Sequence, residues 1–201
     1  MAPDPDAALF LAFQRGDAAA FRTLYERHAR AMVAFCFHHV RDAARAEELA
    51  QDVFVKLHRA RDSYRPTARF KTFLYRIAAN HCLNELRRGE WRAHAADRAA
   101  GQDGPADPDL LPSGAASPDA SAEAAKLEAA VRAMLDRLPE KQRTAFVLAR
   151  FEGLSYEEIA DVLETTVAAV KSLVHRATVA ATAALAPFAA AGEVAAEEVP
   201  S

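Results

Sequence analysis

The chain has 201 residues, of which 51% are hydrophobic, with only 7 glycines and a formal net charge of -3. This length accommodates one large domain or two small ones, and an alanine-rich composition with few β-branched runs favours an all-α protein. No apolar run approaches the length of a membrane span and the N-terminal residues are acidic, which argues against a signal peptide; we expect a cytoplasmic protein without membrane insertion.

The charge is unevenly distributed along the chain. Residues 1–92 carry 16 Lys and Arg against 11 Asp and Glu, whereas residues 93–122 carry 1 against 5 and residues 123–201 carry 8 against 12. Nine of the basic residues lie between positions 58 and 92. A polyanion is therefore expected to bind near that segment.

The first elements are helices that supply a core. Residues 6–14 predict a short apolar helix, and a longer helix with a 3.6-residue apolar period follows. His28 and His39 lie on its apolar stripe without companions at ligand spacing, so we expect core packing rather than a metal site. Cys36 and Cys82 lie beside apolar residues and are expected to be buried free thiols.

Residues 42–61 predict a third helix, which Asp42 caps. Its buried stripe runs from Ala46 to Leu57, and its outward side mixes acidic with apolar residues. The helix macrodipole explains acids near the N-terminus, but it does not explain exposed apolar residues. We interpret this outward side as a docking surface for a basic partner; it consists of Glu47, Glu48, Gln51, Asp52, Phe54, Val55 and His58.

A helix over residues 69–88, RFKTFLYRIAANHCLNELRR, organises the first domain. Two of its faces are apolar and a narrow seam between them is not. Guanidinium groups suit phosphates, amides suit base edges and an aromatic ring suits base stacking, although a solvated face of a buried helix explains the same pattern. The polar loop before it, residues 62–68, either holds an unstacked base or is an ordinary connector. The seam consists of Phe73, Arg76, Asn80, Asn84, Arg87 and Arg88.

After Trp91 the apolar periodicity stops. Residues 93–120 are rich in Ala, Asp, Gly, Pro and Ser, which predicts a flexible acidic linker between two domains. A second helical domain is expected over residues 121–186. Residues 187–201 are predicted to be a disordered acidic tail.

The second domain contains a pair of short helices. Ser155 opens the first with a capping box, and Thr166 caps the second after a tight turn at Glu164. A generic helical hairpin has the same outline, but the short turn and Ala160 near the crossing favour a helix-turn-helix.

Taken together, these motifs resemble the extracytoplasmic-function (ECF) group of bacterial sigma-70 family sigma factors, the subunits that direct RNA polymerase to promoters. AEELAQDVFVKLHRA is similar to region 2.2, and FKTFLYRIAANHCLNELRR is similar to regions 2.3 and 2.4. LPEKQRTAFVLARFEGLSYEEIADVL, followed by AVKSLVHRA, is similar to region 4. The resemblance implies a sigma region 2 helical bundle over residues 1–92 and a sigma region 4 helix-turn-helix domain over residues 121–186.

The resemblance also implies partners and contact residues. Core RNA polymerase would contact Glu48, Leu49, Gln51, Asp52, Phe54 and Val55. The minus-ten element of promoter DNA would contact Tyr64, Arg65, Arg69, Lys71, Phe73, Arg76, Asn80, Arg87 and Arg88. The minus-thirty-five element would contact Thr166, Ala168, Lys171, Ser172, His175 and Arg176. An anti-sigma factor is a further implied partner, and the acidic linker is implied to thread through the polymerase.

Four positions depart from the family pattern. Phe73 stands where Trp is usual, and Glu164 stands at the Gly of the turn, where a left-handed backbone would cost about 1 kcal/mol. Ala169 and Leu173 stand where relatives commonly carry Thr and Arg. The nearly neutral recognition face predicts weak DNA binding by region 4 and a protein contact at Leu173.

No motif indicates catalysis. A Gly-rich phosphate loop, a nucleophile with a paired base and a metal-ligand cluster are all absent from the sequence, so we expect no enzyme activity, cofactor or metal. Two alternatives stay open: a helix-turn-helix transcription regulator that acts without polymerase, and a sigma-like decoy that binds an anti-sigma factor. The neutral recognition helix argues against the first, and the aligned seam Arg76, Asn80 and Arg87 argues against the second.

Overall fold

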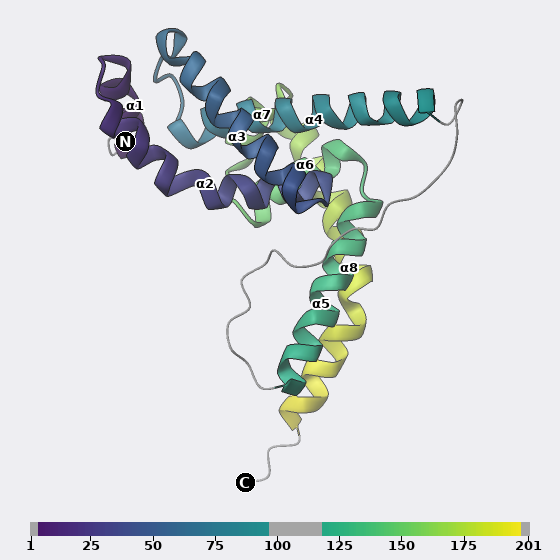
Figure 1. Ribbon diagram of the computed structural model, residues 1–201. Coiled ribbons are helices and arrows are strands. Elements are labelled where there is room, and N and C mark those ends of the chain that lie inside the picture. Colours follow the sequence, from purple (N-terminus) through teal and green to yellow (C-terminus); the bar gives the residue numbers. More distant parts are fainter. Residues whose placement is uncertain (1–3, 97–117, 198–201) are drawn as a thin grey trace.

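The computed structural model describes residues 4–96 and 118–197, with side chains described over 4–88 and 125–188. These ranges contain α-helices, one short 3-10 helix and no strand, which confirms the all-α prediction (Figure 1). The elements are α1 (Pro5–Gln14), α2 (Ala18–Val40), α3 (Ala43–Arg59), η1 (Arg61–Ser63), α4 (Phe70–Ala96), α5 (Pro118–Arg137), α6 (Glu140–Arg150), α7 (Tyr156–Leu163) and α8 (Val167–Glu197).

The first domain is a helical bundle formed by α1 to α4, in which α2 packs against each of the other three helices. The capping residue predicted at the start of α3 is confirmed, because Asp42 Oδ1 accepts a hydrogen bond of 2.6 Å from the Arg45 backbone N–H. The core is rich in large side chains with no exposed area, each of which contributes about 1.5–3 kcal/mol when fully buried. Among them are Phe10, Leu24, Met32, Phe35, Leu49, Leu57, Phe70, Leu74 and Tyr75.

Helix α4 buries two faces and exposes a third, as its sequence predicts. Phe70 and Leu74 are buried on one side, and Tyr75, Ala79 and Cys82 are buried on the other. Cys82 meets Cys36 of α2, with 3.7 Å between the sulfur atoms, and both are free thiols. The residues between these faces remain available to solvent.

The second domain is formed by α5 to α8. Ser155 opens α7 with a capping box in which Ser155 Oγ accepts from the Glu158 N–H at 3.2 Å and the Glu158 carboxylate accepts from the Ser155 N–H at 2.8 Å. Glu164 ends α7 in the left-handed conformation, with φ 50° and ψ 52°. Ile159 of α7 and Val170 of α8 are fully buried, so the predicted helix-turn-helix pair has the expected shared core.

The outer bounds of the second domain differ from the sequence prediction. Helix α8 continues through Pro187 to Glu197 and so includes residues 187–197, which the sequence analysis assigned to the tail. The helix is alanine-rich over its second half, and α5 packs along α8. The predicted linker is helical at residues 93–96 and 118–120, and its remaining residues lie outside the described ranges.

The two domains pack against each other through α2 with α6 and α4 with α7. Helices α5 and α8 extend together away from this body (Figure 1). The helices described here include none that combines the length and the apolar character needed to cross a membrane.

Candidate polymerase and nucleic-acid interfaces

The exposed seam of α4 has the side chains that the sequence predicts. Arg76, Asn80, Arg87 and Arg88 are exposed along one side of the helix. The Arg76 guanidinium carbon lies 5.6 Å from the centre of the Phe73 ring, a cation-π arrangement that holds the cation beside an aromatic surface. Along these residues the helix offers positive charge and an amide group to a nucleic-acid strand that lies across it.

A small cavity lies at the N-terminal end of this seam. It has a volume of about 200 Å³ and is open to solvent on one side. Among the described side chains, Tyr64 Oη and Thr72 Oγ1 are buried and have no hydrogen-bond partner, and an unpaired buried hydroxyl normally costs about 1–3 kcal/mol. The cavity is therefore a candidate site for a polar ligand; it is lined by Tyr64, Arg65, Thr67, Ala68, Thr72, Phe73, Arg76 and Asp161.

Helix α1 fixes the loop that forms this cavity. One Asp4 carboxylate oxygen accepts from the backbone N–H groups of Asp6 and Ala7, and the other accepts from the Phe70 N–H at 2.7 Å. The same side chain thus caps α1 and satisfies an orphan donor at the start of α4. Gln14 Nε2 donates to the Arg61 carbonyl at 2.9 Å.

The ring of Tyr64, one of the predicted minus-ten contact residues, faces the core. Only 2% of the residue is exposed, and the ring packs against Phe10 and Phe73 with centroid distances of 4.8 and 4.9 Å. Thr72 is a cavity residue that the sequence prediction missed. Its position one helical turn before Arg76 on the seam is the signal that identifies it.

The outward face of α3 is exposed at Gln51, Asp52 and Val55. The exposure predicted for Phe54 is wrong, because the residue is only 6% exposed and its ring packs edge-on against Tyr25 at 4.7 Å. Leu49 is fully buried and cannot contact a partner directly. A shallow apolar groove of about 390 Å³ lies here instead, lined by Phe21, Tyr25, Gln51, Phe54, Val55, His58 and Arg59.

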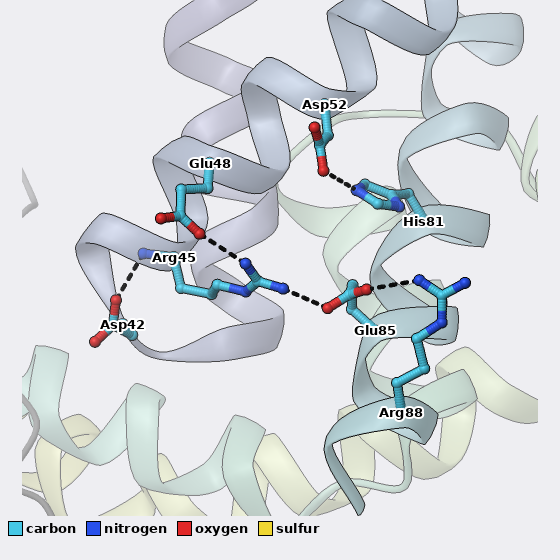
Figure 2. A network of polar contacts seen from close by, with 7 residues as sticks. All are labelled: Asp42, Arg45, Glu48, Asp52, His81, Glu85 and Arg88. Atoms are coloured by element: carbon cyan, nitrogen blue, oxygen red, sulfur yellow. Dashed lines mark hydrogen bonds and ion pairs between the residues drawn. The ribbon is translucent and has the colours of Figure 1, made fainter. Parts of the chain in front are cut away.

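A polar network joins α3 to α4 beside this face (Figure 2). Arg45 donates to Glu48 at 2.6 Å and also to Glu85 of α4, and Arg88 donates to the other oxygen of Glu85 at 3.0 Å. Although burial opposes it, the hydrogen bonds from Arg88 and Arg45 lower the pKa of Glu85, so this carboxyl stays ionised at neutral pH.

Asp52 belongs to the same side of the bundle. Its carboxylate lies 3.2 Å from His81 Nε2 (Figure 2). Burial, and then the charge of Lys56, lower the pKa of His81, so the imidazole is mainly neutral at neutral pH. The network fixes the spacing of α3 and α4, and with it the two surfaces that they carry.

The recognition helix α8 presents few basic groups. Thr166 caps it, with Oγ1 accepting from the Ala169 N–H at 3.2 Å. Leu173 packs partly buried against the core, so the predicted protein contact at this residue is not supported by its position. The predicted residues Ala168, Lys171, Ser172, His175 and Arg176 are all exposed.

Two basic side chains that were predicted to contact DNA instead contact residues of the second domain. Arg69 Nη1 lies 3.5 Å from Glu158 Oε1, and Lys71 Nζ donates to the Glu152 carbonyl at 2.5 Å. The sequence carries no local signal for these contacts, because the partners are separated by 89 and 81 positions. The remaining predicted minus-ten residue, Arg65, is exposed and donates to nearby backbone carbonyls.

Comparisons with known proteins agree with this geometry. The family described as Sigma-70 region 2 matches residues 24–92, and the family described as Sigma-70, region 4 matches residues 128–179. These matches cover the bundle with the α3 and α4 surfaces and the domain with the helix-turn-helix. Helix α1 precedes both of them.

Relatives and a solved structure extend the similarity over most of the chain. The RNA polymerase sigma-H factor of Pseudomonas aeruginosa is 35% identical, with 92% of this chain and 96% of the relative covered. The ECF RNA polymerase sigma-E factor of Escherichia coli K12 is 32% identical, with 86% of this chain and 90% of the relative covered. The structure of CnrH in complex with the cytosolic domain of CnrY superposes with a TM-score of 0.62 at 26% identity, covering 90% of this chain and 97% of that one. The chain belongs to the ECF group of the sigma-70 family of RNA polymerase sigma factors.

Proposed function

We propose that this sigma factor acts through three surfaces on two partners, core RNA polymerase and promoter DNA. The α3 face binds polymerase, the α4 seam with its cavity binds and opens the minus-ten element, and α8 contacts the minus-thirty-five element. The chain acts by binding rather than by catalysis, in the cytoplasm where polymerase and DNA are found.

The cavity beside the α4 seam is the observation that supports the minus-ten assignment most strongly. Tyr64 and Thr72 line a space beside Arg76, and their buried hydroxyls have no partner among the described side chains. A base that leaves the duplex offers a planar ring with donors and acceptors at its edge. The cavity receives such an edge, while Arg76, Asn80 and Arg87 hold the phosphates that follow.

The groove on α3 supports the polymerase assignment. It combines apolar side chains, including the 43% exposed Tyr25 and the 46% exposed Val55, with the acidic rim of Asp52. An apolar centre with a charged rim is the usual anatomy of a protein interface. A basic, partly apolar helix of the polymerase fits it, and an anti-sigma factor that covers the same groove would keep the polymerase away.

Run-off transcription with purified core polymerase and fragmented genomic DNA tests this function. Discrete start sites that require the protein are the expected result. The double variant Gln51→Ala, Val55→Ala should lower polymerase affinity and transcript yield together, because both side chains are exposed on the groove and neither supports the core. The control Arg30→Ala replaces an exposed residue outside the groove and should transcribe normally.

The rivals predict different results in the same assay. A regulator that acts without polymerase would bind a duplex through its second domain and give no start sites, and a decoy would bind an anti-sigma factor but not core polymerase. If start sites appear and the double variant matches wild type, the sigma assignment stands and the α3 groove is not the docking surface.

A further inference from the structure

The loop that forms one wall of the cavity has few contacts of its own. Residues 64–69 connect η1 to α4, and four of them line the cavity. Among the described contacts, one backbone hydrogen bond begins and ends within residues 65–68, from the Thr67 N–H to the Arg65 carbonyl at 2.8 Å. A segment with so few internal bonds opens easily. Contacts from other elements must therefore hold the cavity wall in place.

Helix α1 contacts both ends of this loop. At one end Gln14, the last residue of α1, donates from Nε2 to the Arg61 carbonyl at 2.9 Å and to the Tyr64 carbonyl at 3.4 Å. At the other end, an Asp4 carboxylate oxygen accepts from the Phe70 N–H at 2.7 Å. A helix holds its own two ends at a fixed separation. Helix α1 therefore also fixes the separation of the two ends of the loop.

Aromatic packing joins the middle of α1 to the same segment. Phe10 is fully buried, and its ring centre lies 4.8 Å from that of Tyr64 and 5.3 Å from that of Phe70. The guanidinium carbon of Arg61 lies 5.5 Å from the centre of the Phe13 ring. The loop thus rests on α1 along its length as well as at its ends.

Helix α1 is in turn anchored to the bundle by Asp6. One oxygen of this carboxylate accepts from Arg27 of α2 at 2.6 Å, and the other lies 2.8 Å from His28 Nε2. The position of the loop is therefore fixed relative to α2 as well as to α4.

We infer that Gln14 and Asp4 are positioning residues for the base that leaves the duplex: they hold the two ends of residues 61–70 and so keep the cavity in the shape that receives the base. This inference rests on the proposed function of the α4 seam and its cavity. Neither side chain is among those that line the cavity, so both act through the loop. A preformed cavity does not have to be ordered when the base arrives, and this saving raises the affinity for that base.

Two substitutions remove these contacts without a large change in α1. Gln14→Met keeps an unbranched side chain with good helix propensity, but it has no donor for the two carbonyls. Asp4→Asn keeps a good N-cap, but its amide has one acceptor oxygen where the carboxylate has two, so the Phe70 N–H loses its acceptor when that oxygen caps α1. Urea denaturation checks that both variants are folded.

The matched control is Gln142→Met. It makes the same replacement at a half-buried position of α6 in the second domain, where it does not touch the loop. Any effect of exchanging an amide for a thioether in general would appear in this variant too.

An abasic scan measures whether the two residues act on one base. Each full-length protein is bound to core polymerase and to a forked promoter fragment, chosen from the run-off assay, whose non-template minus-ten strand is single. For each position, the affinity for a fragment that lacks that base is compared with the affinity for the intact fragment. Wild type should lose about tenfold at the position whose base enters the cavity.

The variants should differ from wild type at that position alone. Gln14→Met and Asp4→Asn should lose only about threefold there, because a loop without its hydrogen bonds holds the base less well. At the other minus-ten positions their losses should equal those of wild type. Gln142→Met should follow wild type throughout.

Two results would overturn the inference. One is a full tenfold loss retained at that position in both variants. The other is a change spread evenly over all minus-ten positions, which would make α1 a general support of the bundle. A wild type without any position of special loss would instead remove the captured base, and with it the proposed role of the cavity. The inference and the function on which it rests therefore fail in different ways.

Discussion

Two adjacent histidines at the end of α2 are held neutral by the fold. His39 is fully buried, with Nδ1 2.9 Å from the Phe35 carbonyl and Nε2 3.0 Å from Thr144 Oγ1. Burial lowers the pKa of His39 to about 4, and burial together with the charge of Arg41 lowers the pKa of His38 to about 4. Both rings lie near the junction of the two domains.

These pKa shifts predict a loss of stability in mild acid. At pH values between about 4 and the ordinary pKa of 6.5, the unfolded chain binds protons that the folded chain excludes, so the free energy of unfolding falls as the pH falls through this window. The buried His39 alone accounts for about 3 kcal/mol, with most of the loss complete near pH 4. Urea denaturation of the full chain at several pH values measures this loss.

The variant His39→Gln separates this effect from the titration of carboxyl groups. Its stability should change less between pH 6.5 and pH 4 than that of wild type, whereas His175→Gln, at an exposed position, should follow the wild-type curve. An equal pH dependence in all three proteins would show that His39 is not held neutral by the fold.

Individual side chains differ in how far the sequence predicts their positions. Arg76, Asn80 and Arg87 were predicted correctly as exposed, because the helical period alone separates them from the buried faces. Phe54 and Tyr64 were not, because non-local partners bury them: Tyr25 covers Phe54, and Phe10 covers Tyr64. A helical pattern identifies the residues that share a face, but only the packed neighbours decide how much of that face remains open.

At the scale of elements, two helices end at residues whose backbone conformation is strained. Glu164 and Arg41 both end helices with positive φ, at 50° and 59°. The left-handed conformation costs a residue with a Cβ roughly 1 kcal/mol relative to glycine. Arg41 also makes the interdomain ion pair with Asp136, whereas Glu164 has no such role among the described contacts.

Replacing Glu164 with glycine should therefore stabilise the second domain. Glu164→Gly relieves the strained φ and is expected to raise the free energy of unfolding by about 0.5–1 kcal/mol, less the added flexibility of the unfolded chain. In contrast, Glu157→Gly places glycine in the first turn of α7 and should lower the free energy of unfolding, by at most about 1 kcal/mol. Urea denaturation of the two variants should give shifts of opposite sign; a destabilised Glu164→Gly would show that this turn is not strained.

The local sequence predicts where the helices begin better than it predicts how far they extend. The caps at Asp42, Ser155 and Thr166 and the apolar period of α4 act over four residues or fewer, and the structure confirms them. The extent of α8 depends instead on α5, which packs along it. Composition alone predicted disorder beyond Ala186, because an acidic, alanine-rich tail has little apolar area of its own.

At the scale of the whole molecule, the arrangement of the two domains decides which sites are available. Tyr75 and Glu152 are separated by 77 positions, and His39 and Thr144 by 105. No periodicity or motif records such pairs, so the sequence predicted both surfaces but not that one domain covers part of the other. In this arrangement of the domains the α3 groove remains open to polymerase. The N-terminal end of the α4 seam, in contrast, is covered by α7.

The central claim is that Arg76, which lines the same cavity as Asp161 of the second domain in the free chain, contacts the non-template strand in the promoter complex. A photoreactive phenylalanine analogue placed at position 76 tests both halves. In the free chain we predict a cross-link to α7 near Asp161, which lines the same cavity; in an open complex with core polymerase we predict a cross-link to the non-template strand of the minus-ten element and loss of the internal one. A transcriptionally active complex that keeps the cross-link to α7, or that gives none to the non-template strand, would contradict the account.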